Sequence, residues 1–218
     1  MSSKEIKNYL NTNRRDFANQ PFSEEMTLEN PIKQYEKWFN EALKSNILDP
    51  YAACLSTVDK LGRPTSRILY IRDIVSDGFV FYTNYNSNKG SDISINNYAS
   101  LNIFWGELER QIRIQGTISK VKGSVSDKYF NSRPRSSQIG AWASSQSQKI
   151  KDRSELESKI KFYERKFENK NVSRPPHWGG YCLLPTLLEF WQGRSSRLHD
   201  RIVYTKDNNQ WSKSRLSP

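Results

Sequence analysis

The chain has 218 residues, enough for one domain with a substantial hydrophobic core, and 12% of them are aromatic. Its formal net charge is +11, with 12 Lys and Arg against 14 Asp and Glu in residues 1–109, and 22 against 9 in residues 110–218. The aromatic residues lie in patterned segments, which excludes a disordered chain, and the basic half favours anionic partners: nucleic acid, anionic membranes or phosphorylated small molecules.

The sequence has no sign of a membrane span, a leader or a metal site. No apolar run approaches the roughly 18 residues that a spanning helix needs, and the start, MSSKEIKNYL, lacks the apolar stretch of a signal peptide. Cys54 and Cys182 lie in apolar, strand-like runs, and the two cysteines and two histidines form no zinc or iron–sulfur spacing. We expect a cytoplasmic protein with reduced cysteines, no metal and no membrane association.

The first 28 residues differ from the rest of the chain. Their periodicity is weak, and we expect a flexible N-terminal arm over residues 1–28, followed by a single domain over residues 29–218. A helix is predicted from Asn30, a suitable N-cap, with Pro31 in its first turn and apolar residues at helical spacing up to Leu43. This helix should pack on the core.

Short runs rich in β-branched and aromatic residues follow. They predict strands over residues 52–58, 65–72, 79–83, 100–105 and 110–121. DKLGRP and VSDG, between the first three runs, are typical of hairpin connections, and a short helix is expected over residues 89–97. Closely spaced antiparallel strands in this number curl into a barrel or divide into two sheets.

The period becomes helical from residue 124 to about 169, with a break at Pro134 and a clear helix through SELESKIKFYERKF. Strands resume over residues 179–185, 187–193, 197–205 and 210–216. No repeat or linker divides the chain. The predicted fold class is therefore mainly antiparallel β with flanking helices.

Familiar nucleotide, hydrolase and zinc-protease motifs are absent from the sequence. One motif does suggest a phosphate site: Tyr129, Arg133 and Ser137 are spaced i, i+4, i+8. On a helix they would share one face and offer a phenol, a guanidinium and a hydroxyl to a phosphate group. Because Pro134 breaks a helix, that face would join two short elements; an exposed polar helix end is the alternative interpretation.

A second motif is RSSRLHDR, in which Arg197, His199 and Arg201 occupy every second position. On a strand these three side chains would point the same way, toward a polar and anionic group. A solvated strand face is the alternative.

Two further positions could contact a ring-shaped ligand. Gln111 alternates with isoleucines on a predicted strand, and its amide can bind the edge of a heterocycle or simply face solvent. Trp191 either packs in the core or flanks a planar ligand.

These motifs together resemble the pyridoxine (pyridoxamine) 5′-phosphate oxidase family. The matching pieces occur in order along nearly the whole chain: NRRDF, SRILYIR, FYTNYNSNKG, FWGELERQIRIQG, KYFNSRPRSSQIGAWASSQS, HWGG, EFWQGRSSRLHDR and RLSP. The resemblance implies an FMN-binding split β-barrel and a homodimer with FMN at the subunit interface. It also implies a cytoplasmic flavoprotein of vitamin B6 metabolism that oxidises pyridoxine or pyridoxamine 5′-phosphate to pyridoxal 5′-phosphate, with O2 as acceptor and H2O2 as product.

The resemblance further implies roles for individual residues. The FMN contacts, drawn from both subunits, would be Arg67, Tyr82, Thr83, Lys89, Gln111, Gln146, Ser147, Trp191 and Arg201, with Arg67 and Lys89 at the phosphate end. The substrate phosphate would be bound by Arg72, Tyr129, Arg133 and Ser137. Arg197 and His199 would be the catalytic pair that aligns the pyridine ring with the flavin for hydride transfer. Arg14 and Phe17 would belong to the arm that closes over the pocket.

Three positions depart from the family's usual residues. Arg72 stands where lysine is usual and exchanges a point charge for a planar fork, and Phe17 stands where tyrosine is usual and lacks its hydroxyl. Asn88 replaces an arginine beside Lys89, which would cost about 1–3 kcal/mol of FMN binding if that arginine contacted the phosphate.

Three other functions are alternatives that the residues favour less, and no nucleic acid partner is expected. A related split-barrel flavoprotein with another reduced substrate would be expected to keep the FMN residues and lose the substrate residues. A β-barrel that binds nucleic acid would be colourless and would show steep salt dependence. A family member that carries pyridoxal phosphate without turnover is suggested only by Phe17 and Asn88.

Overall fold

The structure is a computed structural model that describes residues 1–17 and 20–218, so residues 18 and 19 of the expected arm lie outside the described part. The chain divides into two compact units. The first comprises Met1–Pro50, Phe104–Ile112 and Leu188–Pro218, and the second comprises Tyr51–Ile103 and Arg113–Leu187. The domain boundary at residue 28 remains a prediction. None of the described helices is long and apolar enough to cross a membrane.

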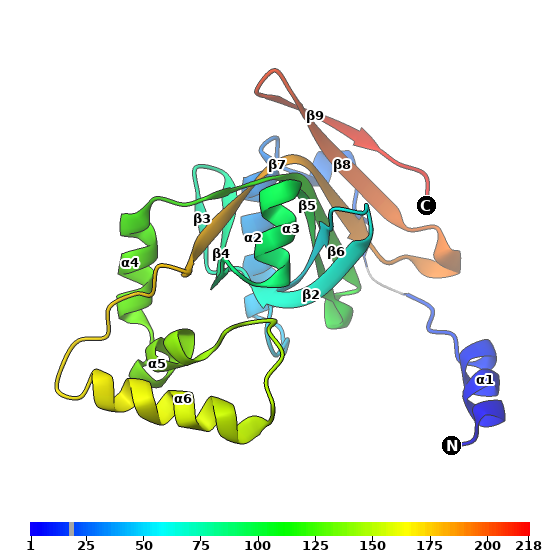
Figure 1. Cartoon of the computed structure of the whole chain (residues 1–218). Helices are drawn as coiled ribbons and strands as arrows, with labels where there is room; N and C mark the ends of the chain where they lie inside the picture. The colour runs from blue at the N-terminus through cyan, green and yellow to red at the C-terminus, as the bar shows by residue number, and fades with distance from the viewer. Residues whose placement is uncertain (18–19) are drawn as a thin grey trace. The chain divides into compact units, whose positions relative to one another are not determined.

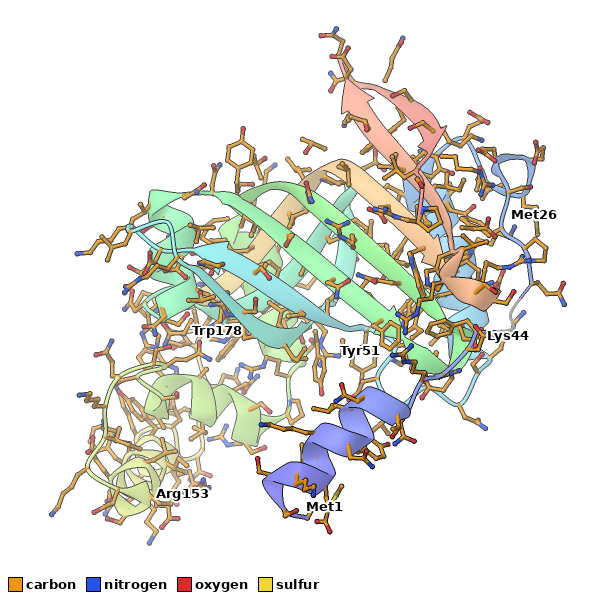
Figure 2. The ribbon with its side chains drawn as sticks, turned by 90° about the vertical axis from the view of Figure 1, so that its right-hand side faces the viewer. Met1, Met26, Lys44, Tyr51, Arg153 and Trp178 are labelled. Atoms are coloured by element: carbon orange, nitrogen blue, oxygen red, sulfur yellow. The ribbon has the colours of Figure 1, made fainter. Side chains whose placement is uncertain are left out.

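The first unit begins with a helix that its weak periodicity does not predict. α1 (Ser3–Thr12) starts at a capping box, in which the side chains of Ser2 and Glu5 each accept a hydrogen bond from the other's backbone N–H. None of its residues is buried (Figure 2). Local capping, and not an apolar face, therefore defines this helix.

Helix α2 (Pro31–Leu43) starts where the sequence predicts, after the 3-10 turn η1 (Glu24–Met26). The Asn30 side chain accepts hydrogen bonds from the backbone N–H groups of Ile32 and Lys33. Trp38, on the buried face of the helix, is 1% exposed and meets the edge of Phe190 at 5.2 Å between ring centroids. The predicted packing of this helix on the core is confirmed.

The strands are β1 (Ala52–Val58), β2 (Pro64–Tyr70), β3 (Asp73–Val75), β4 (Gly78–Asn84), β5 (Tyr98–Trp105), β6 (Arg110–Lys120), β7 (Trp178–Gln192), β8 (Asp200–Asp207) and β9 (Gln210–Arg215). In the second unit the strand order is β2-β1-β5-β6-β7-β4-β3 (Figure 1). The pairs β1–β2, β1–β5, β3–β4 and β4–β7 are antiparallel. In the first unit β8 pairs with β7 and, antiparallel, with β9.

The hairpin predicted at VSDG is present, although it joins β4 to the short strand β3, which lies outside the strand predicted over residues 65–72. Ser76 and Asp77 have φ angles of 49° and 65°. Both lie in the left-handed region that a two-residue hairpin turn requires. The turn residues therefore predict this hairpin, whereas the pattern of apolar residues does not predict β3.

The helices of the second unit are α3 (Asn88–Ile95), α4 (Gly123–Ser132), α5 (Arg135–Ala143) and α6 (Arg153–Lys166). Pro134 is the N-cap of α5, so the predicted break is confirmed. Helices α5 and α6 lie side by side over a core that contains Phe130, Ile139 and Phe167 (Figure 1). Residues 144–152 are not helical, although a helical period was expected there.

Two strand predictions were wrong. The expected pair over residues 179–185 and 187–193 is the single strand β7, because proline removes only its own N–H from a ladder and the strand continues through Pro185. The expected strand over residues 197–205 starts only at Asp200. Ser196 and Arg197 have φ angles of 54° and 61°, which a strand excludes, and they lie in the 3-10 turn η3 (Ser195–Arg197). The fold class, mainly antiparallel β with flanking helices, is confirmed.

Candidate active site

A buried lysine lies at the start of α3 in the second unit. Lys89 is 9% exposed, and its Nζ donates hydrogen bonds to Ser87 Oγ at 2.9 Å, Thr83 Oγ1 at 3.1 Å and Gln146 Oε1 at 3.2 Å. Burial, reinforced by Arg67 and opposed by Asp92, lowers the pKa of Lys89 from 10.5 to about 8. All three bonded acceptors are neutral, so this ammonium group is well placed for an anion.

Arg67, on β2, is held beside this lysine by a threonine pair. Its guanidinium donates hydrogen bonds to Thr57 Oγ1 at 2.6 Å and to Thr65 Oγ1 at 2.7 Å. Both threonine hydroxyls also donate to Asp92 Oδ2, at 2.7 and 3.1 Å. Asp92 itself lies 3.9 Å from the guanidinium, so the threonines bridge the buried carboxylate to Arg67.

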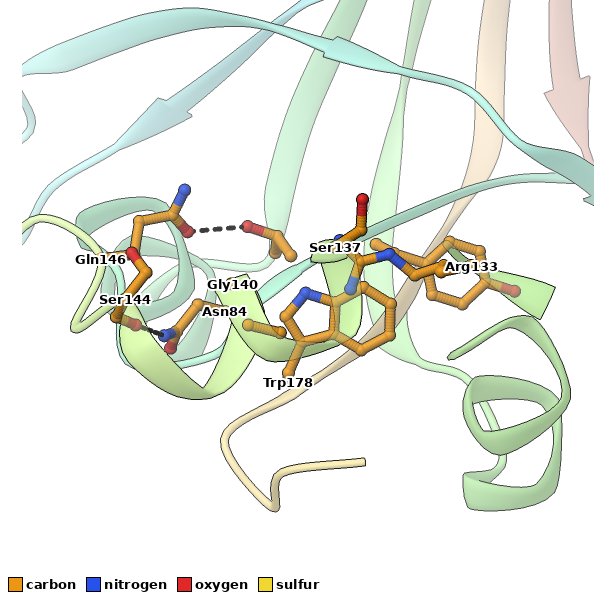
Figure 3. A pocket seen from close by; sticks show the side chains of 10 residues that line it. Asn84, Arg133, Ser137, Gly140, Ser144, Gln146 and Trp178 are labelled. Atoms are coloured by element: carbon orange, nitrogen blue, oxygen red, sulfur yellow. Dashed lines mark hydrogen bonds between the residues drawn. The ribbon is translucent and has the colours of Figure 1, made fainter. Parts of the chain in front are cut away.

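The segment after α5 completes this group. Gln146 accepts a hydrogen bond from Thr83 Oγ1 at 3.2 Å, and Asn84 Nδ2 donates to the Ser144 carbonyl at 3.3 Å (Figure 3). Ser147 Oγ accepts from the backbone N–H of Asn88 at 3.3 Å. Gln146 and Ser147, predicted by resemblance alone, are therefore brought to the start of α3.

The predicted phosphate residues lie around one cavity of about 370 Å³ in the second unit. Its lining residues are Ile68, Leu69, Tyr70, Arg72, Tyr82, Thr83, Lys89, Tyr129, Arg133, Pro134, Ser137, Gln146 and Trp178. Tyr129 lies on α4, Arg133 is the C-cap of α4 and Ser137 lies on α5, so the shared face is built from two short helices, as Pro134 requires. The lining holds three cationic side chains and, among the described residues that form it, no carboxylate.

Arg133 lies over the ring of Trp178 in this cavity. Its guanidinium carbon is 4.6 Å from the Trp178 ring centroid (Figure 3), and Trp178, Tyr82 and Tyr129 form a parallel stack. The Nη1 atom of Arg133 is buried and has no hydrogen-bond partner in the described part of the chain. A buried donor without an acceptor is costly, so this atom points to an anionic ligand.

The first unit holds the predicted catalytic pair on a loop instead of a strand. Arg197 lies in η3 and His199 lies between η3 and β8, whereas Arg201 lies within β8. The alternating strand face proposed for these three residues is therefore wrong, because the left-handed Ser196 and Arg197 turn the chain before β8 begins.

His199 is held by the backbone of this loop. Its Nδ1 accepts a hydrogen bond from the Arg194 N–H at 3.1 Å, so the neutral imidazole carries its proton on Nε2. Partial burial and Arg197 lower the pKa of His199, while Asp16 opposes the shift. The neutral ring can thus donate from Nε2 to an acceptor.

Two aromatic rings contact the ring of His199. Phe17 meets Trp191 and His199 edge-on, at 5.6 and 5.5 Å between ring centroids, and Trp191 lies 4.6 Å from His199. A Cβ on Gly193 would lie 2.8 Å from Phe17 Cγ, so the glycine makes room for this ring. Arg14 lies exposed on the same N-terminal segment.

Two other predicted FMN contacts belong to the first unit. Arg201 Nε donates to Glu189 Oε1 at 2.8 Å, and Glu189 is 3% exposed. Gln111 is half-buried on β6. Their role in binding FMN remains a prediction.

Sequence reasoning missed several residues of the site. They are Asp16, Tyr51, Thr57, Thr65, Asp92 and Trp178. The only local signal is the β-strand alternation that places Thr65 and Arg67 on one side of β2. The other partners come from distant parts of the chain.

Comparisons with known proteins identify the family of this chain. A family model described as "Pyridoxamine 5'-phosphate oxidase" matches residues 39–165, and one described as "Pyridoxine 5'-phosphate oxidase C-terminal dimerisation region" matches residues 178–218. A protein of Cytophaga hutchinsonii named pyridoxine/pyridoxamine 5′-phosphate oxidase is 50% identical over 94% of this chain and 96% of its own length. One of Neisseria gonorrhoeae with the same name is 44% identical over 96% and 99%.

Solved structures share the fold. PhzG from Burkholderia lata, in complex with tetrahydrophenazine-1-carboxylic acid, is 30% identical and has a TM-score of 0.86 over 92% of this chain and 99% of its own. An FMN-binding protein from Nostoc punctiforme has a TM-score of 0.67 at 18% identity, covering 84% and 97%. The predicted split-barrel fold is confirmed. The family models and the close relatives together establish that this chain belongs to the pyridoxine/pyridoxamine 5′-phosphate oxidase family.

Proposed function

We propose that this protein is an FMN-dependent oxidase that converts pyridoxine 5′-phosphate or pyridoxamine 5′-phosphate to pyridoxal 5′-phosphate. The observation that carries the proposal is the cavity of the second unit, where a buried Arg133 Nη1 lacks an acceptor among cationic and hydroxyl side chains. A phosphate monoester supplies the missing acceptor oxygens and the negative charge. The membership of the chain in its family indicates the part of the substrate beyond the phosphate, a pyridine ring of the vitamin B6 type.

The FMN phosphate fits the group around Lys89. Its ammonium contacts only neutral acceptors, and Arg67 is fixed nearby by the two threonines. Such a buried, partly desolvated cation is a suitable partner for a phosphate. A bound FMN would supply the hydride acceptor and the route by which the electrons reach O2.

The protein's own residues bind and orient the substrate. We infer that Arg133, Ser137, Tyr129 and Arg72 hold its phosphate, and that Arg197 and His199 orient its pyridine ring. Because His199 carries its proton on Nε2 when neutral, it can donate to an oxygen on that ring. Correct alignment of the exocyclic carbon is the main contribution that the protein makes to the rate.

The overall reaction balances without a further redox partner. The alcohol loses two electrons and two protons to become an aldehyde, and O2 gains them to become H2O2. The amine additionally consumes one water and releases ammonia.

We further propose that the protein is a homodimer. The match of residues 178–218 to a dimerisation region supports this assembly. FMN would bind at the subunit interface.

One observation favours a second candidate. The similarity to PhzG, which was solved with tetrahydrophenazine-1-carboxylic acid, is compatible with oxidation of a reduced tricyclic carboxylic acid. The vitamin B6 relatives are more similar, at 44–50% identity, and the phosphate-binding residues are all present. We therefore place the phosphate ester first.

The first test is the visible absorption spectrum of the purified protein before and after anaerobic addition of pyridoxine 5′-phosphate. We expect a flavin spectrum that bleaches with substrate and returns with air. A bound flavin that bleaches only with a reduced phenazine carboxylic acid would favour the second candidate. A protein that takes up no FMN would contradict both.

A further inference from the structure

Arg72, which lines the cavity of the second unit, contacts two tyrosines that have no role in the proposed function. Its guanidinium carbon lies 4.7 Å from the ring centroid of Tyr70 and 5.0 Å from that of Tyr51. The two rings meet edge to face, with centroids 4.9 Å apart and planes at 86°. The guanidinium therefore contacts two aromatic rings that also support each other.

We propose that Tyr51 and Tyr70 are positioning residues that fix the Arg72 guanidinium as a planar fork for the substrate phosphate. The inference rests on the proposed function, since it concerns the same cavity. It adds a source of phosphate specificity that Arg72 would not have as an isolated arginine.

The backbone holds all three residues in place. The Arg72 N–H donates to the Val80 carbonyl at 2.8 Å, and the Ile71 N–H donates to the Tyr51 carbonyl at 3.0 Å. Tyr70 is the last residue of β2 and pairs with Ala52 of β1, directly after Tyr51. Only the long side chain of Arg72 is therefore left to be ordered.

The two tyrosine rings are expected to restrict the conformations of the Arg72 side chain. Arg72 is exposed, and an exposed arginine has many rotamers, most of which would turn its charge away from the cavity. After burial, Arg72 is a cause of the lowered pKa of Arg133, so the two guanidinium groups repel each other. Aromatic faces attract a cation without neutralising it, whereas a carboxylate would also compete for it with the phosphate.

The test measures equilibrium binding of pyridoxal 5′-phosphate and of pyridoxal, which lacks the phosphate, to the FMN-loaded protein by calorimetry. Tyr70→Leu should raise the Kd for pyridoxal 5′-phosphate about two- to fivefold and leave the Kd for pyridoxal unchanged. Tyr70→Phe, the matched variant that keeps the ring, should bind like the wild type. Tyr51→Leu should behave like Tyr70→Leu.

A second set of variants, made in Arg72→Met protein, tests whether Tyr70 acts through Arg72. In Arg72→Met, which removes the guanidinium, Tyr70→Leu should have no further effect on the Kd, because the ring acts only through the arginine. Tyr98→Leu serves as a control, since Tyr98 is 65% exposed and does not line the cavity. An equal loss in both backgrounds, or an equal loss for pyridoxal, would overturn the proposal and leave Tyr70 with a packing role.

The same titrations separate this inference from the proposed function. In one outcome the wild-type protein binds pyridoxal 5′-phosphate tightly and Tyr70 and Arg72 are coupled, but no vitamer bleaches the flavin. The role of the tyrosines in positioning Arg72 is then supported, and the proposed reaction is wrong. If turnover is normal and the coupling between Tyr70 and Arg72 is absent, the proposed reaction is supported and the positioning role of the tyrosines is wrong.

Discussion

The buried ammonium group of Lys89 links the proposed cofactor site to pH. Its three hydrogen-bond acceptors are uncharged, and the charged groups that act on it are Arg67, which repels it, and Asp92, which attracts it. Burial and Arg67 lower its pKa to about 8. A bound phosphate would stabilise the charged form and raise this pKa again.

FMN affinity should therefore depend on pH in a defined window. Below about pH 8 Lys89 is already protonated, so FMN binds without proton uptake. Above that value the free protein loses the proton that the complex keeps, and the affinity should fall by up to about tenfold per pH unit. Titrating flavin-free protein with FMN between about pH 7 and pH 9.5 measures the effect.

Lys89→Arg is the matched control, because arginine stays charged throughout this range. Its FMN affinity should be independent of pH even if it is weaker than that of the wild type. A wild-type curve as flat as that of the variant would show that Lys89 does not contact the phosphate.

Single residues of the proposed phosphate site could be predicted from the sequence where their spacing is local. Tyr129, Arg133 and Ser137 follow one another along two helices, so their helical spacing indicates the shared face despite the break at Pro134. Asp92, Thr57 and Tyr51 could not be found in this way. Their importance comes from contacts with Arg67 or Arg72, and single-sequence patterns carry no information on which distant strands will pair.

At the scale of elements, the loop between β7 and β8 is hydrogen-bonded to the N-terminal segment. Asp16 Oδ1 accepts hydrogen bonds from the backbone N–H groups of Phe17 at 3.1 Å and Ser196 at 3.2 Å. Ser196 and Arg197 both have left-handed backbone angles, which are unfavourable for residues other than glycine. Asp16 therefore stabilises the turn that presents Arg197 and His199.

Removing this carboxylate should weaken substrate use without removing the flavin. Asp16→Ala deletes the acceptor for Ser196, and a net loss of about 1 kcal/mol corresponds to roughly a fivefold lower kcat/KM. Asp16→Asn keeps an acceptor oxygen and should lose less. Steady-state kinetics with pyridoxine 5′-phosphate, together with FMN content and Tm, checks this expectation. Equal loss in the alanine and asparagine variants would speak against a role for the hydrogen bond.

The helices and strands differ in how well their own residues predict where they begin. Helix α2 has an N-cap, a first-turn proline and an apolar face, and all three agree, so its start was predicted. The 197–205 segment alternates polar and apolar residues like a strand, yet the turn at Ser196 and Arg197 delays the strand to Asp200. There the backbone angles depend on Asp16, far away in the sequence.

At the scale of the whole molecule, the proposed dimer would need apolar surface to bury. Ile68 lies on β2, an edge strand of the sheet, and is 67% exposed. An edge strand presents unpaired backbone groups, so an exposed apolar side chain on it is a suitable contact for a partner subunit. Ile68 also lines the cavity around Arg72, so its cover would help to enclose the substrate.

Ile68→Lys should therefore weaken the dimer. Burying an isoleucine contributes about 1.5–3 kcal/mol, and a twofold symmetric interface contains each position twice, so the dimer Kd should rise more than tenfold. Leu61→Lys is the matched control, because Leu61 is 65% exposed but lies in the turn between β1 and β2. Sedimentation equilibrium of both variants compares their Kd values with that of the wild type. If Ile68→Lys and Leu61→Lys dissociate alike, the surface around Ile68 is not the dimer interface, and the cavity must be enclosed by other residues.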